Sequence, residues 1–80
     1  MNHDALVSLL RRRLDDIVPG QADSLDLDDD FRDELDLDSM DVLKLVRALH
    51  EELKVDVPDT EVGRLRTLRD FASFLEARVG

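Results

Sequence analysis

The residues of this 80-residue chain best placed to do chemistry are Asp38 and Ser39, which stand where an amphipathic helix is predicted to begin. Asp38 is a favourable N-cap residue, and Asp41, three positions further on, has the spacing of a capping box. A phosphate ester on Ser39 would face unpaired backbone N–H groups and the positive end of the helix dipole. Ser39 therefore suits a phosphate-linked group that stays exposed, and a serine with a purely local capping role is the alternative.

The sequence offers little for catalysis. A hydrolytic serine needs a histidine beside it, but His50 follows Ser39 by eleven residues on the same predicted helix, about 16 Å along its axis. The other histidine, His3, lies near the N-terminus. The absence of cysteine excludes disulfides, zinc–thiolate sites and a thiol nucleophile supplied by the chain. We therefore expect that the protein is not an enzyme.

A cluster of aspartates invites comparison with a calcium-binding loop. If the loop began at Asp26, Asp28 and Asp30 would match the alternate acidic positions of an EF-hand. The sixth position is then Phe31 and the twelfth Leu37, where the motif needs glycine and glutamate. We predict no specific metal site and leave weak divalent-ion binding open.

The net charge of −9 is concentrated in one segment. Residues 23–41 contain ten acidic residues and a single base, Arg32, whereas acids and bases balance in the rest of the chain. Such a segment is either a solvated loop that aids solubility or a recognition surface for basic partners. The acidic balance and the presence of only three aromatic residues, all phenylalanine, argue against nucleic-acid binding.

Apolar residues at three- and four-residue steps predict helices over 4–18, from 39 to about 53, and from a cap pattern at 67–70 to about 79. A short helical turn is predicted over 59–62, and residues 19–38 form a long acidic connection pinned by spaced apolar residues. We expect an all-α fold, a small four-helix bundle of three main helices plus one short helix. The expected inward residues are Leu6, Leu9, Leu10, Leu14, Ile17 and Val18, then Val42, Leu45, Val46, Leu49 and Leu53, then Leu68, Phe71, Phe74, Leu75 and Val79.

Several segments together resemble acyl carrier proteins. The phosphopantetheine attachment motif of that family is similar to Asp36-Leu37-Asp38-Ser39-Met40 and the residues 41–46 that follow. Residues 31–35 are similar to the approach to this motif, residues 51–53 with 55–59 to the end of its helix and the following loop, and residues 67–71 to the start of the last helix. The resemblance covers nearly all 80 residues, which we expect to form a single domain.

The resemblance implies a right-handed four-helix bundle without catalysis of its own, a stand-alone acyl carrier protein. A separate transferase would move 4′-phosphopantetheine from coenzyme A to the hydroxyl of Ser39. The terminal thiol of this arm would hold acyl groups as thioesters and shuttle them between enzymes of fatty-acid, lipid or polyketide biosynthesis. The lack of cysteine agrees with a thiol that has to be added.

The resemblance also implies where partners bind. Phosphopantetheinyl transferases and the enzymes that load, condense or transfer acyl groups present basic patches to the second helix and the preceding loop. Long acyl chains can enter the space between the helices. We expect a cytoplasmic monomer that does not span a membrane, because no run of 18 apolar residues occurs and the N-terminus lacks the layout of a secretory leader. The matching contact positions are Asp38, Met40, Asp41, Glu51 and Glu52.

Two departures from the family pattern bear on function. Asp36 stands where many members have glycine, and aspartate is among the few other residues that tolerate positive φ. Lys44, Arg47 and His50 occupy positions that are acidic or apolar in common fatty-acid carriers, which predicts a specialised lipid, polyketide or aminoacyl pathway. The alternatives are an aminoacyl or D-alanyl carrier, and an unmodified acidic interaction domain.

Overall fold

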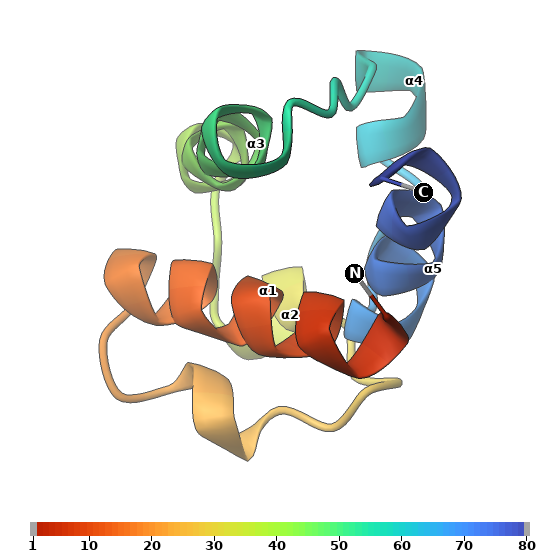
Figure 1. Ribbon diagram of the computed structural model, residues 1–80. Helices are drawn as coiled ribbons and strands as arrows, with labels where there is room; N and C mark the ends of the chain where they lie inside the picture. The colour runs from red at the N-terminus through yellow and green to blue at the C-terminus, as the bar shows by residue number, and fades with distance from the viewer. Residues whose placement is uncertain (1, 80) are drawn as a thin grey trace.

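The computed structural model describes residues 2–79, and within them all regular structure is helical (Figure 1). The all-α class, the three long helices and the short helix at residues 59–62 are confirmed. The elements, in chain order, are α1 (His3–Ile17), the 3-10 turn η1 (Ala22–Ser24), α2 (Phe31–Glu34), α3 (Ser39–Leu53), α4 (Asp59–Val62) and α5 (Leu68–Val79).

The acidic connection, expected as a loop, contains two short helical elements, η1 and α2. The carboxylate of Asp30 accepts hydrogen bonds from the backbone N–H groups of Arg32 and Asp33, at 3.1 and 3.3 Å, and so caps the start of α2. Neither element is long enough to show helical periodicity, so the spacing of the apolar residues gave no signal for η1 or α2.

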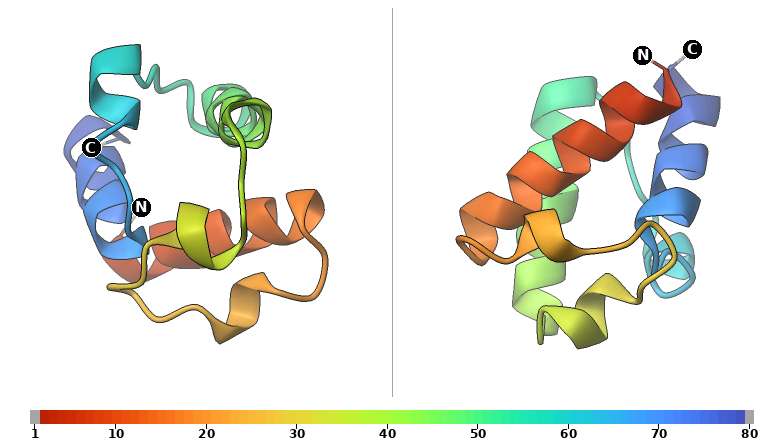
Figure 2. Two further views of the ribbon diagram at one scale, coloured as in Figure 1. Left: turned by 180° about the vertical axis from the view of Figure 1, so that it is seen from behind. Right: turned by 90° about the horizontal axis from the view of Figure 1, so that it is seen from below.

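Helix α1 forms the centre of the fold, packing against both α3 and α5 (Figures 1 and 2). Each long helix has one apolar face, so each depends on the others to remove that face from water. Full burial of a leucine or phenylalanine side chain contributes roughly 1.5–3 kcal/mol. The leucine and phenylalanine side chains with at most 1% exposure in these helices are Leu6, Leu9, Leu10, Leu14, Leu45, Leu49, Leu68, Phe71 and Leu75.

Some residues predicted to face inward lie at the edge of the core. Ile17, Val18, Val46, Leu53, Phe74 and Val79 are only partly buried and pack against the central cluster. The two phenylalanines of α5 therefore differ, because Phe71 is buried whereas the ring of Phe74 is covered by the guanidinium of Arg78, 3.9 Å from its centroid. The core partner of Phe71 is Phe31 of α2, with ring centroids 6.1 Å apart.

The acidic connection is tied down along its length. Arg11 of α1 donates hydrogen bonds to the carbonyl oxygens of Ala22 and Leu25, at 2.9 and 2.8 Å. Further along, the backbone N–H of Phe31 donates to the carbonyl of Arg66, at 3.0 Å. The expectation that this segment lies pinned across the core is confirmed.

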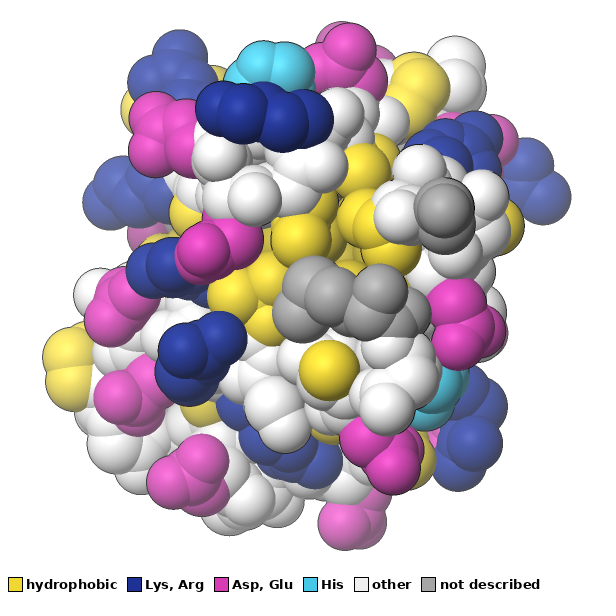
Figure 3. All heavy atoms as spheres, viewed as in Figure 1, with side chains coloured by type: hydrophobic (Ala, Val, Ile, Leu, Met, Phe, Trp, Pro, Cys, Tyr) yellow, Lys and Arg dark blue, Asp and Glu magenta, His cyan; other side chains and the backbone are white. Residues whose placement is uncertain are grey.

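Helix α3 ends at Lys54, whose φ of +58° is left-handed, and an extended segment then leads to α4. In this segment Val55 and Val57 are buried while Asp56 is exposed. Alternate side chains therefore enter the core, although the segment is not part of a β-strand. Apolar side chains gather in the hollow between α3 and α5, with charged groups around it (Figure 3). Within residues 2–79, no helix has the length and apolar content needed to cross a bilayer.

Candidate functional site

Ser39 is the first residue of α3, and its side chain is exposed. The carboxylate of Asp38 accepts a hydrogen bond from the backbone N–H of Asp41, at 2.9 Å, and the carboxylate of Asp41 accepts one from the N–H of Asp38, at 3.3 Å. The predicted capping box is thus confirmed. The hydroxyl of Ser39 makes no hydrogen bond within the described part of the chain, so the capping is done by its neighbours. Ser39 is therefore held on a well-anchored helix start with its oxygen available.

The turn before Ser39 depends on Asp36, which has φ of +53°. The backbone N–H of Asp36 donates to the carbonyl of Asp33, at 3.3 Å, and that of Leu37 donates to the carbonyl of Arg32, at 2.9 Å. This left-handed position ends α2 and redirects the chain into α3. Aspartate here meets the same backbone requirement that glycine would.

An open cavity of about 370 Å³ lies beside Ser39, between α3, α2 and α4. Its size is within the range of small-molecule sites, roughly 300–1,000 Å³. Most of its lining is apolar, with one basic and one acidic side chain among the residues that form it. These are Arg32, Ser39, Met40, Val42, Leu43, Val46, Asp59, Val62 and Gly63.

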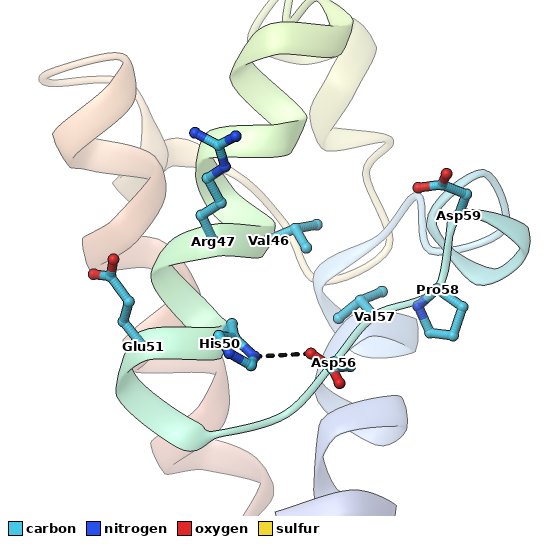
Figure 4. Close-up of a pocket in the computed structure, with 8 residues that line it drawn as sticks. All are labelled: Val46, Arg47, His50, Glu51, Asp56, Val57, Pro58 and Asp59. Carbon is cyan, nitrogen blue, oxygen red and sulfur yellow. Dashed lines mark ion pairs between the residues drawn. The ribbon is translucent and has the colours of Figure 1, made fainter.

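A second open cavity, of about 460 Å³, lies further along α3 (Figure 4). It adjoins the first, because Val46 and Asp59 line both. At its far end the Nδ1 atom of His50 lies 2.8 Å from a carboxylate oxygen of Asp56. Arg47 extends away from this pair along α3, as Figure 4 shows. The two cavities together follow α3 from its first residue into its last turn.

The outer face of α3 presents two large apolar side chains, Met40 and Leu43, which are 61% and 40% exposed. Met40 was expected at a contact surface, whereas Leu43 was not. The exposed position of Leu43 could have been predicted from the sequence. Leu43 follows Met40 by three residues and falls outside the buried stripe of Val42, Leu45 and Leu49. Exposed apolar side chains that lie together on one helix face are typical of interaction sites.

The five predicted contact residues do not form one cluster. Asp38, Met40 and Asp41 lie at the start of α3, and Glu51 and Glu52 lie at its end, roughly 15–20 Å away at the rise of an α-helix. The structure also gives Glu52 another role, because it forms an ion pair with Arg13 of α1. The hydrogen bond from Arg13 lowers the pKa of Glu52.

Two arginines from residues 66–69 partly neutralise the acidic connection. Arg69 forms an ion pair with Asp28 at 2.8 Å, and Arg66 forms ion pairs with Asp30 at 2.8 Å and with Asp33 at 3.5 Å. The hydrogen bond from Arg69 lowers the pKa of Asp28. At Asp30, desolvation favours the neutral acid, but hydrogen bonds from Arg66 and the backbone outweigh it and the pKa is lowered. Three of the ten carboxylates thus hold the fold together, which weakens the interpretation of the whole segment as a recognition surface.

The family comparison agrees with this geometry. The model of the phosphopantetheine attachment site matches residues 4–75, from α1 into α5. The chain belongs to the acyl carrier protein family. Membership implies that 4′-phosphopantetheine is the covalently attached group of this domain.

Three similar proteins illustrate the relationship, each named acyl carrier protein. The protein of Bdellovibrio bacteriovorus is 42% identical over 48 residues, which are 60% of this chain and 62% of that protein. The protein of Helicobacter hepaticus is 38% identical over 47 residues, or 59% and 62% of the two chains. The protein of Treponema pallidum is 38% identical over 56 residues, or 70% and 72%. The matched region spans less than two thirds of the first two relatives, and all three are named as carriers rather than catalysts.

The residues around Ser39 are compatible with the arm that the family carries. The exposed hydroxyl lies where helix N–H groups and the dipole favour a phosphodiester. Between its phosphorus and its sulfur the arm spans about 15 Å when extended, at the reach per bond of a polypeptide backbone. This length is close to the distance along α3 from Ser39 to His50, about 16 Å. The arm could therefore either project into solvent or lie along the two cavities.

Proposed function

We propose that Ser39 carries 4′-phosphopantetheine and that residues 1–80 act as one acyl carrier domain, with the cytoplasm as its compartment. The observation that carries this proposal is an exposed, unengaged serine hydroxyl at the start of α3, beside a cavity and inside the region matched by the family model. The arm supplies the thiol that this cysteine-free chain lacks, and acyl groups are held on it as thioesters.

The attachment is a phosphoryl transfer catalysed by a separate phosphopantetheinyl transferase. The oxygen of the Ser39 hydroxyl attacks the phosphorus of coenzyme A that bears the pantetheine. The bond from that phosphorus to the oxygen bridging the two phosphates breaks, and adenosine 3′,5′-bisphosphate leaves. The hydroxyl proton passes to a base of the transferase or to solvent. The carrier contributes position and exposure, because its backbone holds the oxygen at a fixed helix end.

The loaded acyl chain is proposed to occupy the cavity beside Ser39. Val42 and Val46 of α3 and Val62 of α4 supply apolar walls, and the exposed side chains of Met40 and Leu43 also line the cavity. The exposed pair Met40 and Leu43, with the acids at the start of α3, is proposed as the docking surface for partner enzymes with basic patches.

The experiment is intact-mass analysis after incubation with coenzyme A and a broad-specificity phosphopantetheinyl transferase. The wild type is expected to gain one phosphopantetheine and Ser39→Ala none. Ser73→Ala, which alters an exposed serine of α5, is the matched control and should be modified like the wild type. A wild-type protein that remains unmodified supports an acidic interaction domain instead, and modification of Ser39→Ala would assign the arm to another residue.

We further propose that the carrier serves a specialised pathway. Lys44 and Arg47 are exposed on α3, close to Met40 and Leu43, and would repel the basic docking patches of common fatty-acid enzymes. Generic fatty-acid synthase enzymes should therefore use the wild type poorly and the double variant Lys44→Glu, Arg47→Glu better. Full activity of the wild type with these enzymes would contradict specialisation. Efficient loading by an aminoacyl or D-alanyl ligase would favour the aminoacyl carrier instead.

A further inference from the structure

Arg32 is an unexpected cation in the wall of the cavity beside Ser39. It is the only base in the acidic stretch 23–41, yet it forms no ion pair with any carboxylate of residues 2–79. Two of the three carboxylates nearest in sequence are engaged elsewhere, because Asp30 caps α2 and pairs with Arg66 and Asp33 also pairs with Arg66. The third, Glu34, forms no ion pair with Arg32. No carboxylate therefore neutralises Arg32, in contrast to Arg66 and Arg69, which pair with Asp30 and Asp28.

The hydrogen bonding of Arg32 is incomplete. Its Nη2 group donates to the carbonyl of Val62 at the end of α4, at 3.1 Å, which fixes the guanidinium between α2 and α4. Its Nε–H group is buried and has no acceptor within the described residues. A buried donor without a partner is destabilising, and more so when it belongs to a charged group. Because Arg32 also lines the cavity beside Ser39, an oxygen atom that enters the cavity can reach this guanidinium, and Nε–H would donate to it once the side chain rotates.

The surroundings of Arg32 restrict what that oxygen can belong to. Ser39 lines the same cavity, so anything tethered to it starts at the cavity's edge. The remaining walls are mainly apolar, with Asp59 as the one carboxylate. A hydrocarbon chain would fill the apolar part and leave Nε–H unpaired. A chain that also bears a hydroxyl or keto oxygen would fill the same space and satisfy the donor.

We propose that Arg32 is a specificity-determining residue that donates a hydrogen bond to an oxygen substituent of the acyl cargo. This proposal rests on the carrier function proposed above and names its cargo class as hydroxyacyl or ketoacyl chains. The phosphodiester of the arm is the other possible acceptor. We favour the cargo because the phosphodiester is attached to the exposed Ser39 at the cavity's edge, whereas Nε is buried.

The test compares octanoyl and 3-hydroxyoctanoyl groups. A broad-specificity transferase loads each from its coenzyme A thioester, and intact mass confirms loading, so that failure of the carrier function is seen before cargo selection is measured. The rate of thioester cleavage by hydroxylamine is then divided by the rate for the same free acyl-pantetheine. In the wild type we expect the hydroxyacyl group to be protected about fivefold to tenfold more than the octanoyl group, the effect of one net hydrogen bond.

Arg32→Met retains the aliphatic stem and removes every donor, so it should abolish this difference. Arg64→Met changes an exposed arginine next to α4 that does not line the cavity, and it should keep the difference. Equal protection of the two cargoes in the wild type, or a difference that persists in Arg32→Met, would overturn the proposal.

An NMR measurement keeps the test independent of whether Arg32→Met folds. The ¹⁵N–¹H resonance of the Arg32 Nε–H group, assigned through its own side chain, should move downfield in the 3-hydroxyoctanoyl protein and not in the octanoyl protein. A shift of the same size in protein that carries the arm without cargo would assign the acceptor to the arm and refute the cargo claim.

Discussion

At the scale of single residues, capping and chemistry at the start of α3 belong to different side chains. The carboxylates of Asp38 and Asp41 each accept a hydrogen bond from the other's backbone N–H group. The hydroxyl of Ser39, between them, makes no hydrogen bond within the described residues. A serine that had to cap its own helix would lose that freedom, because its oxygen would be held against the backbone. The arrangement therefore separates the stability of the helix from the chemistry proposed at its first residue.

Asp38 tests this separation. Asp38→Ala removes the cap oxygen and is expected to lower the free energy of unfolding by about 1 kcal/mol. Asp38→Asn retains an oxygen that accepts the hydrogen bond from Asp41, so its stability in urea denaturation should stay close to that of the wild type. Both variants lack the carboxylate beside Ser39 and should slow phosphopantetheine transfer, measured by intact mass over time. If Asp38→Asn were modified at the wild-type rate, the charge of Asp38 would have no role in modification.

At the scale of elements, the helix ends decide how α3 is positioned. Asp36 before α3 and Lys54 after it both adopt left-handed backbone conformations, with φ of +53° and +58°. The first turns the chain from α2 into the helix. The second redirects it into the extended segment that buries Val55 and Val57. Of the two, lysine is the less suited to this conformation, since it lacks the short polar side chain that lets aspartate tolerate it.

Replacing Lys54 by glycine should therefore stabilise the protein. A glycine at this C-terminal position removes the clash of the β-carbon, and we expect Lys54→Gly to raise the free energy of unfolding by about 0.5–1 kcal/mol. Thermal denaturation followed by circular dichroism should show a midpoint several degrees higher. Lys54→Ala retains the β-carbon and serves as the control with no gain. An equal gain in both variants would mean that the lysine side chain, and not its backbone conformation, is unfavourable.

At the scale of the whole molecule, the acidic connection is fastened to residues 66–71, which lead into α5 and form its first turn. Arg66 and Arg69 hold Asp30 and Asp28 across more than thirty residues of sequence. Phe31 adds an apolar anchor to the same junction through its contact with Phe71. These ion pairs engage only part of the acidic segment, and the paired side chains of Asp28 and Asp33 are themselves 74% and 77% exposed.

The link between Asp28 and Arg69 predicts a dependence of stability on pH. The pKa of Asp28 is lowered in the folded state, so its ionised carboxylate stabilises the fold fully at neutral pH. This stabilisation is lost progressively as the pH falls from about 5, past the ordinary pKa near 3.9, and through the lowered pKa. Arg69→Met should therefore melt below the wild type at pH 7, and the difference in melting temperature should shrink towards pH 3. Arg64→Met is the control with little change at either pH. A difference that stayed constant from pH 7 to pH 3 would show that Arg69 acts through packing.

Much of this protein could be predicted from local sequence because its helices are regular and well marked. The period of the apolar residues and the capping box at Asp38 predicted the three long helices, and the short turn over 59–62 was predicted as well. The same local pattern singled out Ser39, since a helix start is recognised from its neighbours in sequence. The tolerance of aspartate for positive φ at residue 36 was also readable, and the structure confirms it.

Tertiary structure alone decided what surrounds Ser39. The cavity brings α2, α3 and α4 together, and no periodicity reports which side chains from separate elements meet. The same is true of the ion pairs that engage Glu52 and Asp28, and of Arg32, whose place in the sequence marks it only as the lone base of an acidic segment. Long-range contacts depend on how helices pack, and packing is set by the shapes of all the buried side chains at once.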